Sequence, residues 1–257
     1  MTRKYGLFST AVCCLMLSPQ LLAASFDAKV EWAQRVILSV PVSGIVSKVT
    51  VETGQKIRAG QILLKLDQAP FLTALQAAKA ARRQSATNRR EARRDLTQTK
   101  ELYARGLISN VELENAQLKA KRANAAWDAA AARVKTANYK LAHSRILAPF
   151  DGWVLSRRVA PGQSIISTQH AETLLVVAAS NSYIARAEVP GGKLKKLQPG
   201  AAVNVEVDGI DFKGTVRQLG LEPVRPTTGG EAYYEVGVHF DSGGRLLRAG
   251  QKAEISF

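Results

Sequence analysis

The sequence predicts an α+β protein of several modules, in which a small β-sandwich is split by a long helical hairpin and followed by an all-β module. A shift of 108 positions superposes two segments that flank residues 68–143, so one β-unit is present as two halves. The identical pairs are Pro41 with Pro149, Gly44 with Gly152, Val46 with Val154, Val51 with Val159, Gly54 with Gly162, Gln55 with Gln163 and Ile57 with Ile165. Residues 68–143 are rich in alanine and arginine at helical spacing, and beyond residue 178 apolar residues alternate between Gly and Pro turns.

Residues 1–25 have the pattern of a secretory signal. Arg3 and Lys4 precede an apolar run at 12–17, and small residues follow at 23–25. A transmembrane anchor is the alternative, but the apolar run is shorter than the ~20 residues that a membrane span requires. We expect cleavage near Ser25, which removes Cys13 and Cys14 and leaves the mature chain without thiol chemistry.

The chain is strongly basic, with a formal net charge of +15 at pH 7. A positive net charge of this size is typical of proteins that bind nucleic acid, an anionic membrane surface or an acidic protein. The expected export signal makes nucleic acid the weakest of the three, so no nucleic-acid partner is expected.

Residues 26–38 read as a first strand, residues 39–67 as the first half of the sandwich and residues 144–177 as the second half. The Gly-Gln pair in each half marks a tight turn, where glycine takes positive φ without a Cβ clash. Structural turns are expected at Gly44, Gly54, Gly152 and Gly162. Neither half could bury its own apolar face, so the two are expected to form one sandwich.

The hairpin of residues 68–143 carries helix signals at both ends. Asp67 or Gln68 can cap the first helix, Pro70 fits its first turn, and Gly106 can end it in a left-handed cap. Ser109-x-x-Glu112 is a capping box that opens the second helix. Two helices of about 35 residues give a rod of roughly 50 Å.

A coiled-coil seam is predicted between the two helices. The second helix contributes Leu113, Ala116, Ala120, Ala123, Trp127, Ala130, Val134, Ala137 and Leu141. The first contributes a face of small residues at Ala74, Ala78, Ala81, Ser85, Ala92 and Thr99. An antiparallel arrangement places Trp127 near Ser85 and Asn88.

Six arginines of the first helix fall within an arc of about 140°, roughly opposite the small residues. This basic contact stripe consists of Arg82, Arg83, Arg89, Arg90, Arg93 and Arg94. A charge run often forms only a solvated face. Because Glu91 and Asp95 are the sole acids nearby in this helix, an acidic partner surface is an equally good interpretation.

The ordered motifs resemble those of periplasmic membrane fusion proteins, the adaptor subunits of bacterial tripartite efflux pumps and type I secretion systems. They are Pro41-x-x-Gly44-x-Val46 with Gly54-Gln55, then the hairpin, then Ala148-Pro149-Phe150-Asp151-Gly152-x-Val154 with Pro161-Gly162-Gln163. The resemblance implies a split lipoyl (biotinyl-like) sandwich without a swinging cofactor arm, followed by a small β-barrel at 178–257 that the 26–38 strand completes. The family's further membrane-proximal domain is not expected, because too few residues follow the barrel.

The resemblance also implies partners and a docking site. An inner-membrane transporter of the RND or ABC type, an outer-membrane channel and self-association, commonly into six copies, are expected in the periplasm. The family's channel-docking signature places Arg, Leu and Ser at spacings matched here by Gln98, Leu102 and Ser109, with glutamine in place of arginine. Leu107 and Ile108 lie in the same turn and add apolar surface for contact.

No catalytic or metal-binding pattern is present. His143, His170 and His239 lie in different modules, no nucleophile motif or phosphate-binding loop appears, and Met1 and Met16 both lie in the signal region. The expected function is a non-enzymatic adaptor that exports small toxic compounds through a tripartite pump, without cofactor or metal. A type I secretion or ABC-exporter adaptor, a lipoyl or biotinyl carrier module and a basic nucleic-acid-binding hairpin are the alternatives.

Overall fold

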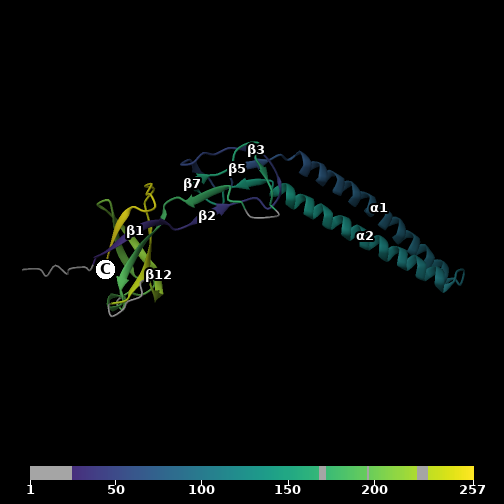
Figure 1. Ribbon diagram of the computed structural model, residues 1–257. Coiled ribbons are helices and arrows are strands. Elements are labelled where there is room, and N and C mark those ends of the chain that lie inside the picture. The colour runs from purple at the N-terminus through teal and green to yellow at the C-terminus, as the bar shows by residue number, and fades with distance from the viewer. Residues whose placement is uncertain (1–24, 168–171, 196, 225–230) are drawn as a thin grey trace, which may run out of the picture. The chain divides into compact units, whose positions relative to one another are not determined.

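The computed structural model describes residues 25–167, 172–195, 197–224 and 231–257 (Figure 1). The expected secretory signal lies outside these residues except for Ser25. The chain forms two compact units, which are described in turn. Of the described residues, one unit contains those in 31–184 and 241–249, and the other contains those in 25–30, 185–240 and 250–257.

A β-sandwich of two four-stranded sheets forms the base of the first unit. One sheet has the order β2 (Arg35–Leu38), β9 (Leu175–Ala179), β7 (Gly152–Arg157) and β4 (Lys56–Ile57). The other has the order β6 (Arg145–Leu147), β5 (Ile62–Leu66), β3 (Gly44–Val49) and β8 (Ser164–Ile165). Each sheet takes strands from both sides of the helical hairpin, and all the pairs are antiparallel. The two halves of the repeat therefore complete one another's sheets.

The sandwich core contains equivalent residues from both halves of the repeat. Val46 with Val154, Val51 with Val159 and Ile57 with Ile165 are all buried in one cluster with leucines of β5 and β9. Burying a Val, Leu or Ile side chain contributes about 1.5–3 kcal/mol. Since these pairs are supplied equally by the two halves, neither half retains its core without the other.

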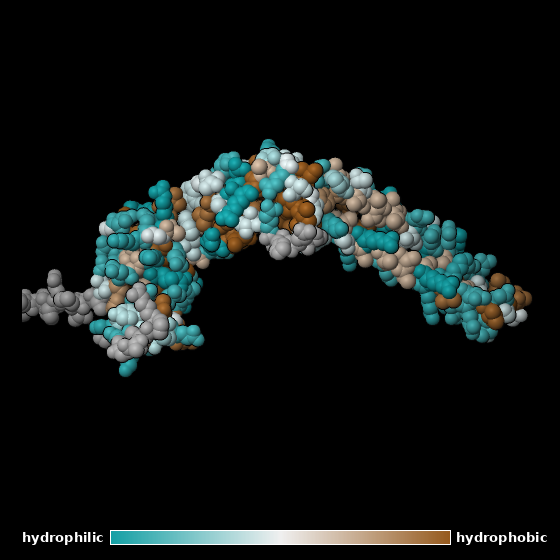
Figure 2. Space-filling view, in the orientation of Figure 1, coloured by the Kyte–Doolittle hydropathy of each residue, from teal (hydrophilic) through white to brown (hydrophobic). Residues whose placement is uncertain are grey.

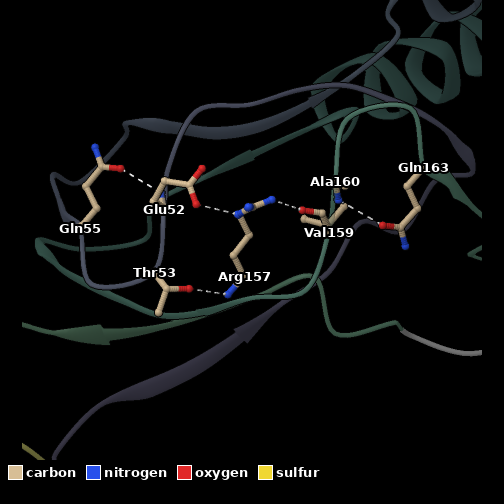
Figure 3. A network of polar contacts seen from close by, with 7 residues as sticks. All are labelled: Glu52, Thr53, Gln55, Arg157, Val159, Ala160 and Gln163. Carbon is tan, nitrogen blue, oxygen red and sulfur yellow. Dashed lines mark hydrogen bonds and ion pairs between the residues drawn. The ribbon is translucent and has the colours of Figure 1, made fainter.

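Equivalent residues of the two halves form equivalent hydrogen bonds. The Gly54 N–H donates to the Val154 carbonyl at 2.8 Å, and the Gly162 N–H, 108 positions later, donates to the Val46 carbonyl at 2.8 Å. The side chains of Gln55 and Gln163 each accept a bond from the backbone N–H three residues earlier, at 2.9 and 3.2 Å (Figure 3).

One contact in this region has no counterpart in the repeat. Arg157 Nε lies 3.0 Å from Glu52 Oε2, and Arg157 Nη1 donates to the Val159 carbonyl at 2.7 Å (Figure 3). The repeat equivalent of Arg157 is Val49 and that of Glu52 is Ala160, and these two residues cannot form an ion pair. Arg157 thus connects the segment at Glu52 with the segment at Val159, and the other half of the repeat has no such connection.

The four predicted turn glycines have two different roles. Gly54 and Gly162 lie in turns with φ of 84° and 86°, in the left-handed region that favours glycine. Gly44 and Gly152 instead begin strands β3 and β7, so their assignment to turns is wrong. A Cβ on Gly152 would lie 2.0 Å from the Ala178 carbonyl oxygen. Close approach between strands β7 and β9 therefore explains glycine at position 152.

The single strand predicted at residues 26–38 is divided between the two units. β1 (Ser25–Trp32) pairs with β14 (Lys252–Ser256), whereas β2 pairs with β9 of the sandwich. Residues 33 and 34 form a bend between them. Val36 and Leu38 pack against the sandwich core, which provides the apolar surface that holds β2 there.

The second unit is built around a closed six-stranded β-barrel, as the all-β pattern and the resemblance together predict. Its order is β1, β10 (Ser182–Pro190), β13 (Tyr233–Asp241), β12 (Ile210–Pro223), β11 (Ala202–Val207) and β14. Every second residue of β11 is buried, which is the alternation expected for strands with one face toward the barrel interior. A short helix, α3 (Gly191–Leu194), follows β10.

His239 on β13 gives the barrel a predictable pH dependence. Burial lowers the pKa of His239 below its ordinary value of 6.5, and the positive charges of Arg217 and Arg186 lower it further. The unfolded chain therefore binds a proton more readily than the folded barrel, so the barrel should lose stability as the pH falls below about 6.5. Urea denaturation between pH 5 and pH 8 measures this slope. His239→Gln should reduce it, and an identical slope in the variant would contradict the assignment.

Candidate docking site at the hairpin tip

Two long helices, α1 (Ala69–Ala104) and α2 (Asn110–Ala142), lie side by side and connect β5 to β6 (Figure 1). At their base the Leu66 N–H donates to the Ser144 carbonyl at 2.8 Å, and Gln68 Nε2 donates to Ser144 Oγ at 3.0 Å. The 36 residues of α1 span about 54 Å at 1.5 Å per residue. The turn between the helices is therefore far from the sandwich.

The surface between α1 and α2 is lined mainly by small side chains. All nine residues predicted for the α2 face are buried or half-buried. On α1, Ala92 is buried and most of the other predicted residues are half-buried, but Ala74 is exposed and Leu75 takes its place. Asp95 and Lys119 form an ion pair of 2.8 Å across the two helices, which raises the pKa of Lys119.

Arg89, one of the six arginines of the predicted basic contact stripe, is not exposed. Its guanidinium carbon lies 3.9 Å from the ring centroid of Trp127, and its side chain is half-buried between the helices. On the helical wheel Arg89 is at the edge of the arginine arc, next to the small-residue face, and the space left by alanines admits its long side chain. Cation–π contacts of this kind contribute about 0.5–2 kcal/mol. Within the described residues, Arg89 Nε and Asn124 Oδ1 are buried without hydrogen-bond partners.

The other five arginines of the predicted stripe are exposed. Their guanidinium groups form no hydrogen bond or ion pair with the part of the chain that the structure describes. We call this set the exposed arginine stripe: Arg82, Arg83, Arg90, Arg93 and Arg94. Gln98, one turn beyond the stripe, is exposed and borders a groove that also contains Asp95 and Lys119.

The turn between the helices is held by backbone hydrogen bonds. Gly106 has φ of 72°, its N–H donates to the Tyr103 carbonyl at 2.9 Å, and the Leu107 N–H donates to the Leu102 carbonyl at 3.0 Å. These two bonds form a Schellman motif, which satisfies carbonyls at the end of α1. The predicted left-handed cap at Gly106 is confirmed.

The predicted capping box at the start of α2 is also present. Ser109 Oγ accepts a bond from the Glu112 N–H at 3.3 Å, and Glu112 Oε2 accepts one from the Ser109 N–H at 2.8 Å. Bonds from the Ser109 backbone and hydroxyl lower the pKa of Glu112. Caps on both sides of a five-residue connection give the tip a defined shape.

Apolar side chains are concentrated at this tip, where Figure 2 shows brown residues at the far end of the hairpin. Leu107 is 65% exposed, while the predicted contact residues Leu102 and Ile108 are half-buried. Val111 and Tyr103 are 64% and 42% exposed and were missed from the sequence. Tyr103 lies in the last turn of α1 and Val111 in the first turn of α2, and this position beside the connection is the signal that could have identified them.

Metal sites and membrane-spanning helices are further features that the described residues could contain. Residues 25–167, 172–195, 197–224 and 231–257 contain no group of three or more His, Cys, Asp or Glu that could hold a metal ion. His170 lies outside these ranges. Among the helices the structure describes, none is both long and apolar enough to cross a membrane.

Residues 35–177 match the model of the RND MFP barrel-sandwich hybrid domain. YdhJ of Escherichia coli K12 is 31% identical over 205 residues, which cover 76% of this chain and 67% of YdhJ. The macrolide export protein MacA of Yersinia pestis is 24% identical over 89% of this chain and 66% of MacA. The multidrug efflux pump subunit AcrA of E. coli K12 is 30% identical over 66% of this chain and 46% of AcrA. The chain thus spans about two thirds or less of these relatives.

Solved structures share the fold. The membrane fusion protein Spr0693 of Streptococcus pneumoniae R6 aligns with a TM-score of 0.69 at 15% identity, over 91% of this chain and 97% of that chain. A MacA–MexA chimera containing the MexA α-hairpin of Pseudomonas aeruginosa aligns with a TM-score of 0.64 at 23% identity, over 91% of this chain and 80% of the chimera.

Proposed function

This chain belongs to the RND membrane fusion proteins, and from that premise we propose that it is a periplasmic adaptor of a tripartite efflux pump. It would join an inner-membrane transporter to an outer-membrane channel for the export of small toxic compounds. The observation that carries the proposal is the family match over residues 35–177, because this range contains both halves of the sandwich and the whole hairpin. MacA and AcrA, whose names refer to macrolide export and multidrug efflux, are consistent with this role.

In this proposal each module has a mechanical task. The split lipoyl-type sandwich of residues 39–67 and 144–177 is a scaffold, and residues 68–143 form an antiparallel coiled coil that spans distance. The barrel of residues 178–257, with β1, contacts the transporter. The small residues that are buried or half-buried between α1 and α2 support the coiled-coil assignment, since small side chains at the contact let two helices approach closely. The role is non-enzymatic and requires no cofactor.

The docking contact with the channel is assigned to the hairpin tip. Leu107, with Val111 and Tyr103, supplies exposed apolar area, while Leu102 and Ile108 support it from half-buried positions. Ser109 and Gln98 supply polar groups at its edge. A tip shaped by caps on both helices loses little conformational entropy on binding, which favours affinity.

Several copies are needed to enclose a path for the exported compound, because one hairpin cannot surround a channel. We infer a ring of copies, commonly six in this family, that forms in the presence of the transporter and channel. Dependence on the partners follows from charge, since basic hairpins repel one another. The transporter is of the RND or the ABC type, and a type I secretion or ABC-exporter adaptor is the alternative form of this role.

Deleting the gene is the direct test of the adaptor role. Cells that express the partner transporter should become more sensitive to at least one exported compound, and a plasmid copy of the gene should restore resistance. Unchanged sensitivity across a broad panel of toxic compounds would count against the proposal. Intact-mass measurement addresses the carrier alternative, since a lipoyl or biotinyl adduct on any lysine would favour a carrier module instead.

A further inference from the structure

The exposed arginine stripe on α1 lies along the side of the hairpin and not at its tip. Asp95, one of the two acids nearby on α1, is already paired with Lys119. We propose that this stripe binds an acidic helical surface of a partner protein, at a contact separate from the tip. The inference does not rest on the pump role, because it follows from charge and spacing on the hairpin.

The length of the stripe sets the size of its partner. Arg82 and Arg94 are twelve residues apart, which corresponds to about 18 Å along the helix. A small anion can contact two or three of these guanidinium groups at most. A second helix with carboxylates at successive i, i+4 and i+7 positions presents charges over the same distance. Arginine suits this role, since its planar fork binds carboxylates through two parallel hydrogen bonds.

A second copy of the same hairpin is a poor partner for the stripe. Residues 68–143 contain fifteen Lys and Arg but six Asp and Glu. Three of the six acids are already engaged within the chain, since Asp95 pairs with Lys119, Glu112 closes the capping box and Glu114 accepts a bond from Asn110. Two such surfaces facing each other would repel.

A lipid bilayer also fits the stripe poorly. Helices that lie in a membrane interface combine basic residues with large apolar side chains that enter the acyl region. Between Lys79 and Lys100, the arc of α1 that holds the stripe contains Ala86 and Thr97 besides the arginines. The opposite face of α1 is covered by α2 and cannot enter lipid. An acidic protein surface is therefore the partner that the observations favour.

Binding of a defined acidic helix tests the proposal. The probe is a fluorescein-labelled synthetic helix of 25 residues with glutamates along one face, titrated with purified residues 25–257 and followed by anisotropy. Changing all five stripe arginines to glutamate should weaken binding about 50-fold, because each exposed ion pair contributes a factor of roughly two and reversal adds repulsion. Raising the salt from 50 to 300 mM should also weaken binding of the unchanged chain.

A matched charge reversal on α2 distinguishes the effect of the stripe residues from the effect of the net charge. Lys121, Arg122, Arg133, Lys135 and Lys140 are all exposed, and changing them to glutamate alters the charge by the same amount. This variant should bind the probe within about threefold of the unchanged chain, and both variants should keep their helical circular dichroism. Equal losses in the two variants, or no binding by the unchanged chain, would overturn the proposal. So would tighter, stripe-dependent binding to a 25-base-pair DNA duplex or to vesicles of phosphatidylglycerol and phosphatidylcholine.

Discussion

Replacing Gly152 with alanine is expected to lower the free energy of unfolding of the β-sandwich by about 3 kcal/mol. The new Cβ would lie 2.0 Å from the carbonyl oxygen of Ala178, and a backbone atom in a paired strand cannot move aside without displacing β9. Val177, next to Ala178, is fully buried, so such a shift also disturbs the core. Urea denaturation, with hydrogen exchange of β7 and β9 as a local reading, measures the effect.

Gly44 provides the control because it occupies the equivalent position in the repeat. A Cβ there would lie 3.2 Å from Cδ1 of Leu66, the end of a side chain that needs to shift by only a few tenths of an ångström. Gly44→Ala should therefore cost about 1 kcal/mol or less, partly offset by the lower entropy of the unfolded chain. Equal losses at the two positions would show that close approach between β7 and β9 is not what requires glycine at position 152.

Replacing Leu107 with aspartate is expected to abolish export and to weaken binding of the outer-membrane channel by 30-fold or more, a value typical of a central interface residue. Leu107 is 65% exposed, so the isolated chain gains no buried charge and should keep its stability. The same substitution at Leu102 is a less specific probe, because that side chain is half-buried at the Schellman turn. Channel pull-down and compound sensitivity measure the effect in cells with all three components.

Leu118 on α2 provides the matched control, since it is 44% exposed on the same hairpin but away from the tip. Leu118→Asp should leave channel binding and export unchanged. Ser109→Ala is less suitable as a probe, because loss of an N-cap by itself costs ~1 kcal/mol of helix stability. If Leu107→Asp leaves both binding and export intact, the tip is not the docking contact.

Much of the sandwich and hairpin could be predicted because their determinants are local or repeated. Gly54 and Gly162 mark their turns, and Ser109 with Glu112 marks the start of α2, through chemistry that acts within a few residues. The 108-residue repeat added long-range information, since equivalent residues make equivalent bonds across the sandwich. Patterns of this kind do not depend on which other strand lies nearby.

The predictions that went wrong depend on neighbours far away in the sequence. The apolar pattern does not show that the chain changes sheets after Trp32, because that depends on the pairing of β2 with β9. From helical spacing, Arg89 was predicted to lie on the exposed side of α1. Its guanidinium group instead packs on Trp127, because the alanines of α2 leave space for it between the helices. At the tip, the different exposure of Leu107 and Leu102 was not predicted, because it depends on the Schellman turn that ends α1 between them.

The pairing of strands from the two halves of the sandwich has a kinetic consequence for folding. β4 pairs with β7, whose first residue lies 95 positions after the end of β4, so residues 39–67 cannot finish folding before β7 is available. Helices form from local contacts within microseconds, whereas distant strand pairing is slow. Once α1 and α2 associate, Leu66 and Ser144 are brought together and most of the entropy of closing that loop has been lost already. The hairpin is thus expected to fold first and to template the sandwich, so a variant that weakens the α1–α2 contact should slow refolding of the sheets.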